Sequence, residues 1–500
     1  MIDQSTSGLF TGMSRKRILV VTAGIMLSLF LSSMESTVVA TAMPTIVGQL
    51  GGLQHYAWVF AAYMVASTTT VPLYGKLSDL YGRRRLYVVA LALFLVGSVL
   101  CGMAASMPQL IAARAVQGAG AGGILPLAFI FIGEMFSMQE RARMQGFFSG
   151  VWGVSSIVGP LLGGFIVDQL SWPWVFYVNV LPGLLAAALV VLAWQDQIGR
   201  AAKPVVDYAG AALLTAGLVT LLVGLMEPGS AQSGLLLVLA GVLFAALLWV
   251  EQRAVDPILP LPLFRQRLFV VTVAHGTLAG MAMFGSISFV PLFVQLVLVT
   301  SALQAGITVT PMLLGWVGAS IISTRIMFRV GYRTLGMLGT SGLVAGAFLL
   351  ARADSASSQQ SIMFFVGMMG VGMGICIPPY IIAVQATVER RLLGTATSMV
   401  QFSRSMGGTV GVSLMGAALS VRLAANLKAG GRDPGLVSQL LDPLPGAVVM
   451  VNEGVRLALA NAISLVFVVA FIASAGALLP TLFAPRTKLA DTAMPAAVEA

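Results

Sequence analysis

The sequence predicts an all-α membrane protein with fourteen transmembrane helices, and three observations support this prediction. Hydrophobic residues make up 58% of the 500 positions and charged residues only 9%, whereas roughly a quarter of an average soluble domain is charged. Apolar runs recur from Ile18 onward, each with the roughly 20 residues that cross a bilayer. Basic loops alternate with nearly uncharged loops. The lipid bilayer is therefore the expected solvent of this chain.

The fourteen expected spans follow one another along the whole sequence. Their approximate ranges are 18–43, 56–77, 86–104, 109–134, 146–167, 174–194, 208–227, 235–251, 268–298, 306–327, 335–352, 361–386, 393–422 and 454–483. Between the last two, glycines and prolines in residues 422–453 favour a surface loop over a further span.

The loop charges orient these spans. Basic clusters at residues 15–17 and 83–85 precede the first and third spans, and most of the 28 lysines and arginines fall on the same side. Cytoplasmic loops carry such an excess, so both termini are expected in the cytoplasm and the chain in the inner, or plasma, membrane. The basic residues are scattered through short loops, so the net charge of +10 does not indicate nucleic-acid binding.

The two halves of the chain resemble each other. Three glycines and a proline of the fourth span recur 252 positions later in the twelfth, as Gly118, Gly120, Gly122 and Pro126 against Gly370, Gly372, Gly374 and Pro378. Glycines of the fifth span likewise recur 248 positions later in the thirteenth: Gly146, Gly159 and Gly163 against Gly394, Gly407 and Gly411. Many transporters are built from two such repeats around a central site.

The repeat offset exceeds six spans with their loops, and the seventh and eighth spans account for the excess. We therefore expect an N-terminal six-helix bundle in residues 1–194, a linker with two inserted transmembrane helices in 195–267, and a C-terminal six-helix bundle with a cytoplasmic tail in 268–500.

The loop after the second span, GKLSDLYGRRR from Gly75 to Arg85, resembles the signature loop of the major facilitator superfamily. Its glycines allow a tight turn, and its acid can pair with neighbouring arginines or lie at a helix N-terminus. The resemblance implies a conformational latch made by Gly75, Asp79, Gly82, Arg83 and Arg84. The alternative is a basic turn that only fixes topology. The counterpart loop at 325–333 keeps Gly331 but has no acid.

The fifth span resembles the antiporter motif of exporters in the same superfamily. The motif residues are Gly146, Ser155, Gly159, Pro160, Gly163 and Gly164. Ser155 stands where that pattern has glycine, a change between small residues that preserves close helix contact. The motif is expected to pack two helices tightly and thereby to keep the cytoplasm-facing state of the transporter sealed.

Further segments are similar to the fourteen-span drug:proton antiporter family, of the QacA and EmrB type. They are MESTVVATAMP from Met34, RAVQGAGAGG from Arg114, WPWVFYVNVLPG from Trp172 and FSRSMGGTVG from Phe402. The resemblance covers nearly the whole chain and implies the major facilitator fold of two six-helix bundles plus two inserted helices. Where that family usually has Asp, this chain has Glu35.

Glu35 is the expected proton-coupling residue. An ionised carboxylate inside an apolar span is costly unless it is paired, hydrated or protonated, and such a group can exchange a proton as its access to water alternates. The alternative is a salt bridge that only joins two helices. The family resemblance places Arg114 beside the substrate cavity, where it would tune this carboxylate. Alternatively, Arg114 would only donate hydrogen bonds to backbone carbonyls.

Inward-facing polar and aromatic residues are expected to line that cavity: Tyr63, Gln117, Trp152, Phe284, Gln295, Gln385 and Gln401. Four other charged or titratable residues are expected to be structural. Glu134 and Glu227 lie at span ends where water is available, His275 has no metal-ligand companion, and Arg404 has no acid nearby in the sequence. Cys101 and Cys376 lack a CxxC neighbour or a nearby histidine, so no metal site is expected.

These features predict a protein that exports lipophilic or cationic drug-like molecules in exchange for protons, as a monomer in the lipid bilayer and with no cofactor beyond the proton gradient. Such export would confer antibiotic resistance. The alternative is an exporter of a native metabolite or lipid that carries drugs incidentally. No channel signature and no catalytic constellation such as HExxH or GxSxG occurs in the sequence, so an enzyme is not expected.

Overall fold

The computed structural model describes residues 14–50, 56–194, 207–226, 231–254, 257, 259, 261–300, 302–389, 392–429 and 453–486. The regular elements within these ranges are helices. The chain divides into two compact units. Unit 1 comprises Met1–Gly224, Ala231–Phe264 and Thr387–Phe402, and unit 2 comprises Leu225–Ser230, Arg265–Ala386 and Ser403–Ala500. The expected domain boundaries after residues 194 and 267 stay predictions.

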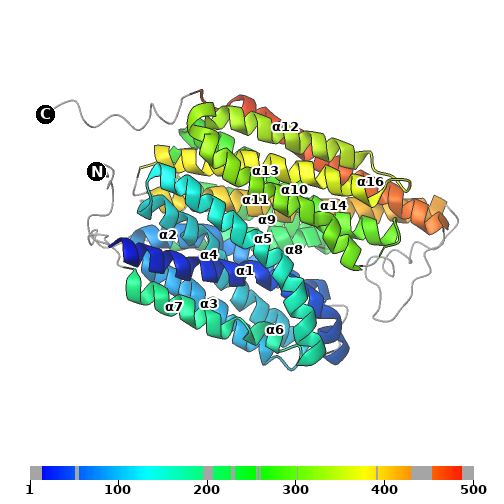
Figure 1. The fold of residues 1–500 in the computed structure, drawn as a ribbon, viewed down its shortest axis with the longest axis horizontal. Coiled ribbons are helices and arrows are strands. Elements are labelled where there is room, and N and C mark those ends of the chain that lie inside the picture. Colours follow the sequence, from blue (N-terminus) through cyan, green and yellow to red (C-terminus); the bar gives the residue numbers. More distant parts are fainter. Residues whose placement is uncertain are drawn as a thin grey trace. The chain divides into compact units, whose positions relative to one another are not determined.

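Unit 1 is a bundle whose helices run in sequence order as α1 (Arg15–Leu50), α2 (Tyr56–Tyr81), α3 (Arg83–Gly102), α4 (Met107–Met135), α5 (Met138–Gln169), α6 (Trp174–Tyr177) and α7 (Val180–Ala193). α1 packs against α5 and α7, while α4 packs against α2 and α3 (Figure 1). The single span expected at 174–194 is divided into α6 and α7, which are separated by Val178 and Asn179. Apolar side chains from these helices form one buried core.

The two inserted helices are α8 (Tyr208–Met226) and α9 (Ala231–Glu251). They lie against each other, because the Ser233 hydroxyl on α9 donates a 2.6 Å hydrogen bond to the Gly224 carbonyl on α8. Several large apolar side chains of α9 are exposed, among them Leu235, Val238 and Trp249. Such side chains are suited to contact with lipid.

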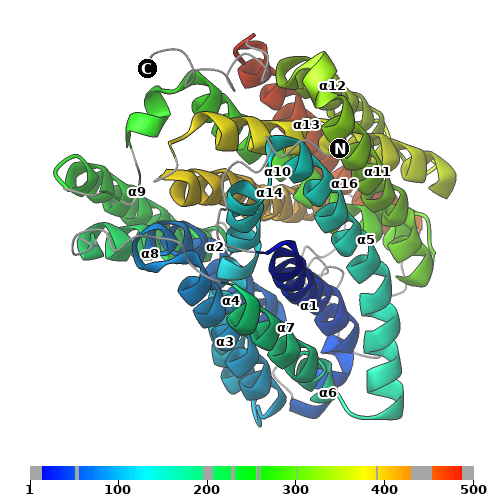
Figure 2. The same cartoon turned by 60° about the vertical axis from the view of Figure 1, so that its left-hand side comes forward.

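Unit 2 contains α10 (Arg267–Leu296), α11 (Ala302–Val330), α12 (Tyr332–Ala351), α13 (Gln359–Thr387), α14 (Leu393–Ala429) and α16 (Glu453–Leu482). α16 packs against α10 and α12 (Figure 2). The first ten residues of α14 belong to unit 1 and the rest to unit 2. α14 also extends through Ala429, so the loop expected from residue 422 begins later, and residues 430–452 lie outside the described ones.

The recurring glycines make matching helix contacts in the two units. A Cβ on Gly118 would collide with the backbone of Tyr63 on α2, and one on Gly370 with the backbone of Met312 on α11. The next pair, Gly120 and Gly372, faces α3 and α12 in the same way. In both units these glycines let the backbones of neighbouring helices touch, which explains the repeat in the sequence.

The connections before α3 and α12 also match. Gly82 has φ 99° and Gly331 has φ 85°, a region that a side chain makes costly. Each glycine directly precedes the helix that follows the turn. The two arginine-rich loops therefore share a backbone conformation that requires glycine.

Twelve segments of the described chain are long and apolar enough to cross a membrane. The prediction of fourteen spans is not supported by this count, because neither α2 nor α5 is among the twelve. Both helices carry charged residues inside their bounds, including Lys76 and Asp79 in α2 and Arg141 in α5. These charges lie near the helix ends, and residues 56–73 of α2 and 150–167 of α5 contain no charged residue.

Candidate functional site

A buried ion pair lies at the centre of unit 1. Glu35 on α1 and Arg114 on α4 are both essentially inaccessible to solvent, and Oε1 of Glu35 lies 2.8 Å from Nη1 of Arg114. Oε2 of Glu35 accepts a 2.5 Å hydrogen bond from the side-chain amide of Asn179. Both carboxylate oxygens are thus occupied, and the guanidinium offsets the negative charge within an apolar core.

Besides Glu35, Arg114 has partners on α2 and on its own helix. Its Nε donates to the carbonyl of Val59 on α2 at 3.3 Å, and its guanidinium lies 4.2 Å from the centroid of the Tyr63 ring. Nη1 also donates to Oε1 of Gln117 at 2.7 Å, and the Gln117 amide donates to the hydroxyl of Ser98 on α3 at 2.8 Å. The predicted residues Glu35, Arg114, Tyr63 and Gln117 therefore form one cluster.

Two members of the cluster, Asn179 and Ser98, were not predicted from the sequence. Asn179 immediately precedes α7 and is fully buried. Asn179 is uncharged and lies 144 positions from Glu35, so the sequence does not show that the two residues are partners. Its polarity could have marked it as a candidate, because an amide inside an otherwise apolar segment needs a hydrogen-bonding partner.

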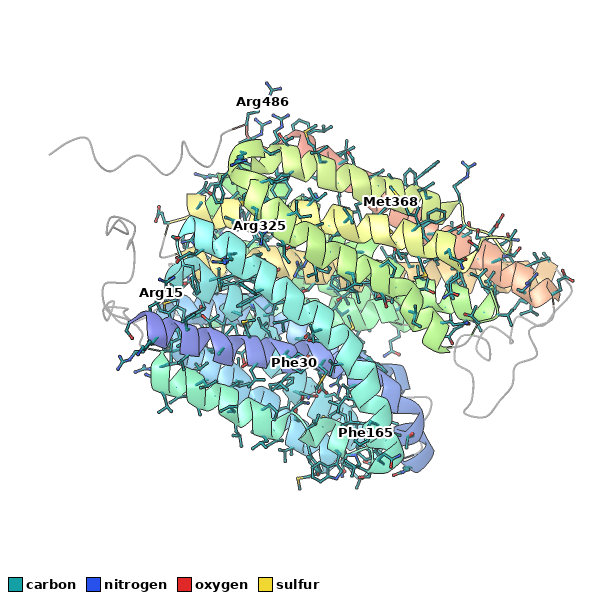
Figure 3. The ribbon with its side chains drawn as sticks, viewed as in Figure 1. Arg15, Phe30, Phe165, Arg325, Met368 and Arg486 are labelled. Carbon is teal, nitrogen blue, oxygen red and sulfur yellow. The ribbon has the colours of Figure 1, made fainter. Side chains whose placement is uncertain are left out.

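The antiporter motif forms the contact between α1 and α5, next to Glu35. A Cβ on Gly159 would collide with the Thr37 side chain, and the hydroxyls of Ser33 and Ser155 are 2.5 Å apart. Figure 3 marks Phe30 on α1, whose carbonyl accepts a 3.1 Å hydrogen bond from Ser33. Ser155 thus adds a polar link where the family pattern has glycine, while the two helices remain close.

The remaining motif residues differ in their surroundings. Gly146 and Gly163 are buried, whereas a Cβ on Gly164 would meet nothing within 4 Å. The Pro160 side chain lies outside the described part of the structure. Only some positions of the motif therefore make the close contact that requires glycine.

The signature loop supplies a second charged cluster at the end of α2. Asp79 Oδ1 lies 2.6 Å from Arg83 Nη2, and Arg83 Nε lies 2.7 Å from Glu134 Oε1 at the end of α4. Asp79 Oδ2 accepts hydrogen bonds from the backbone N–H and the hydroxyl of Thr395 at 3.0 and 2.8 Å. The carboxylate therefore pairs with an arginine and also lies at the N-terminus of α14, where the helix dipole favours it.

The glycines and Arg84 of the predicted latch have separate contacts. A Cβ on Gly75 would collide with Ser398 on α14, so this glycine allows α2 and α14 to approach. Arg84 donates a 2.7 Å hydrogen bond to the carbonyl of Val191 near the C-terminus of α7. In unit 2, Arg333 donates to the carbonyl of Leu482 at the C-terminus of α16 at 2.9 Å. The two arginines thus cap matching helix ends.

The other predicted cavity residues are divided between the units. Trp152 on α5 is 39% exposed and Gln401 on α14 is buried, both in unit 1. Phe284, Gln295 and Gln385 belong to unit 2. A cavity shared by these side chains stays a prediction.

Two buried polar residues of unit 2 were expected to be structural. His275 Nε2 lies 2.9 Å from the Thr340 hydroxyl, which joins α10 to α12. Arg404 on α14 is 8% exposed, and its guanidinium lies 5.8 Å from the centroid of the Trp316 ring. These contacts join helices within unit 2.

Two relatives from Bacillus subtilis (strain 168) are similar to the chain over most of its length. The Multidrug transporter protein MdtP is 38% identical over 418 residues, which is 82% of this chain and 77% of the relative. Multidrug resistance protein 3 is 38% identical over 403 residues, which is 79% of this chain and 78% of the relative. The chain is thus similar to multidrug-type transporters.

Solved structures share the fold at low sequence identity. The human organic anion transporter MFSD10 (TETRAN) matches with a TM-score of 0.61 and 13% identity, covering 91% of this chain and 99% of that one. The proton:xylose symporter XylE matches with a TM-score of 0.60 and 15% identity, covering 95% and 97%. The Major Facilitator Superfamily model matches residues 25–412. The chain therefore belongs to the Major Facilitator Superfamily, as a multi-pass membrane protein with the all-helical fold of that superfamily.

Proposed function

We propose that this protein exports lipophilic or monovalent cationic drug-like molecules in exchange for protons, by alternating access. The observation that carries the proposal is the Glu35 carboxylate, which is fully buried in unit 1 and held by Arg114 and Asn179. A charged residue at this depth is costly and marks a functional site by default. The names of the two Bacillus relatives support drugs as the cargo.

The contacts of Glu35 support a coupling step. Protonation would neutralise the carboxylate and weaken its ion pair with Arg114. Arg114 would keep its bonds to Gln117 and to the Val59 carbonyl, so its charge would stay solvated by the protein. A cationic substrate near Glu35 would compete with the proton for the same charge, which links the two movements.

We also propose that α2 and α5 cross the membrane, giving fourteen spans of the QacA and EmrB type. Both are long helices, of 26 and 32 residues, and each packs along another helix of the bundle. The same proposal places both ends of the chain in the cytoplasm, the protein in the cell's inner membrane as a monomer, and residues 1–194 and 268–500 as its two moving bundles. Labelling of single cysteines placed in the loops flanking α2 and α5 tests this topology.

Substrate-driven proton movement tests the coupling. Purified protein in liposomes is expected to release protons when a lipophilic cation such as ethidium is added, and Glu35→Gln is expected to abolish that release. Glu140→Gln is the matched control, because Glu140 is an exposed carboxylate in the capping box of α5 and makes the same chemical change. Coupled transport that survives Glu35→Gln would disprove the assignment of Glu35.

The alternative, export of a native metabolite or lipid, uses the same site. A metabolite comparison between a deletion strain and its complemented parent distinguishes the two. Accumulation of one cellular compound in the deletion strain, with drug susceptibility unchanged, would favour the alternative and count against antibiotic resistance as the role of the protein.

A further inference from the structure

Arg404 is a buried cation without a carboxylate partner in unit 2. The side chain is 8% exposed, and Arg404 lies about 17 Å from the start of α14 at 1.5 Å per residue. Among the described residues of unit 2, the carboxylates are Asp354, between α12 and α13, and Glu453, at the start of α16. Both are exposed and both lie outside the helix interiors, so neither offsets this charge.

The guanidinium also lacks hydrogen bonds within the described part of the chain. Nε of Arg404 is buried with no partner there, and its contact is with the face of the Trp316 ring on α11. Arg114 in unit 1 is different, because it is bonded to Glu35, Gln117 and Val59. A buried polar group without a partner is rare in proteins and calls for an explanation.

Helix packing does not account for Arg404. Around Arg404, α14 approaches α10 closely through glycines. A Cβ on Gly280 of α10 would collide with the Arg404 carbonyl, and a Cβ on Gly407 of α14 would collide with the backbone of Thr277 on α10. The matching contact in unit 1 is made by Gly159, 248 positions before Gly407, where the position equivalent to Arg404 is Ser156. The corresponding glycine interface of unit 1 forms without a cation at this position, so helix packing does not require the charge of Arg404.

We infer that Arg404 binds the anionic group of a transported molecule whose apolar body rests on nearby rings. Trp316 provides one ring. One turn further along α14, the ring of Phe284 packs over Gly408, on the same helix face as Arg404. A carboxylate or sulfonate would give the guanidinium the charged hydrogen bonds that it otherwise lacks. The inference rests on the proposed export function and extends its cargo from lipophilic cations to amphipathic anions.

Two probes that differ only in charge test the inference. Pyrenebutanoate and pyrenebutylamine share a ring and chain but carry opposite charges, and their binding is measured by energy transfer from tryptophan to pyrene in nanodiscs without a proton gradient, after subtraction of protein-free nanodiscs. Arg404→Gln is expected to weaken pyrenebutanoate binding by about tenfold or more, while pyrenebutylamine binds as before. Retained amine binding also shows that the variant is folded.

Two further variants serve as controls. Arg404→Lys keeps the charge and is expected to retain more pyrenebutanoate binding than Arg404→Gln. Arg352→Gln removes an exposed arginine that also lies over an aromatic ring, Phe348 on α12 at 5.6 Å, and is expected to leave both affinities unchanged.

Three outcomes would overturn the inference. If Arg404→Gln weakened the binding of both probes equally, Arg404 would be shown to stabilise the fold rather than to bind an anionic group. If the wild-type protein bound pyrenebutylamine but not pyrenebutanoate, the inferred anion site would be disproved, whereas the proposed export of cations would still stand. Failure of wild-type protein to bind either probe would count against both the inference and the proposed cargo.

Discussion

The carboxylate of Glu35 is held by a neutral residue, Asn179, as well as by the cation Arg114. Arg114 occupies one oxygen of Glu35 and the amide of Asn179 the other, and all three side chains are buried. Without Asn179, Oε2 of this buried carboxylate would lose its 2.5 Å hydrogen bond, and a lost bond to a charged group is more costly than the loss of a neutral hydrogen bond. Asn179 is therefore a positioning residue for the proposed proton site.

Replacement of Asn179 by alanine is expected to lower the free energy of unfolding by about 1–3 kcal/mol, because it leaves a buried charged oxygen unsatisfied. Thermal unfolding of the purified protein measures this loss. In a Glu35→Gln background the same replacement is expected to cost about 1 kcal/mol less, since the acceptor is then uncharged. Equal costs in both backgrounds would show that Asn179 stabilises the fold without acting on Glu35.

At the residue scale, the two charged residues of the cluster were predictable from the sequence, whereas the neutral residues Asn179 and Ser98 were missed. Glu35 and Arg114 stand out in the sequence because ionised groups are rare inside apolar spans. Asn179 and Ser98 resemble many other polar residues in membrane helices, and nothing local in the sequence names their partners. Arg404 also stands out by charge, but its surroundings depend on α10 and α11, which are far from it in the sequence.

At the scale of the helices, two glycines of the antiporter motif on α5 have different surroundings and can be compared directly. A Cβ on Gly159 would collide with Thr37 on α1, whereas a Cβ on Gly164 would meet nothing within 4 Å. Gly159→Ala is expected to destabilise the protein by about 1–3 kcal/mol through overpacking. Gly164→Ala is expected to be neutral or stabilising by up to about 1 kcal/mol, because alanine favours helix.

Unfolding temperature and drug export, measured for both variants in the same membrane preparation, test this pair. If Gly164→Ala abolished export at normal stability, the motif would have a role beyond the packing of α5 against α1. If Gly159→Ala were neutral, the close approach of these helices would not be needed.

Hydropathy predicted where helices lie better than where they end. α3 and α12 begin three residues before the expected starts at 86 and 335 and end within two residues of the expected ends. In contrast, α1 continues to Leu50 and α5 begins at Met138, eight residues before the expected 146. Hydropathy identifies the residues that lie in lipid, whereas backbone hydrogen bonds allow a helix to continue through polar residues beyond the membrane. The start of α5 could have been predicted from its capping box, Ser137 and Glu140.

At the scale of the whole molecule, the chain repeat was the most informative sequence signal. It predicted matching helices in two halves, and the recurring glycines of α4 and α13 make matching backbone contacts. It did not predict that the first ten residues of α14 group with unit 1. That assignment depends on contacts such as Asp79 with Thr395, which are 316 residues apart in the sequence.

α14 begins in unit 1 and continues into unit 2, and we expect the bonds from Asp79 to Thr395 to restrain the start of this helix. Asp79→Asn removes the charge that holds both Arg83 and the N-terminus of α14. Hydrogen exchange at the Thr395 amide is expected to become about tenfold faster, for a loss near 1.4 kcal/mol, and export is expected to fall. Asp354→Asn, in an exposed turn, is the control and should change neither. Faster exchange at Thr395 with undiminished export would show that this contact stabilises α14 without acting as a latch.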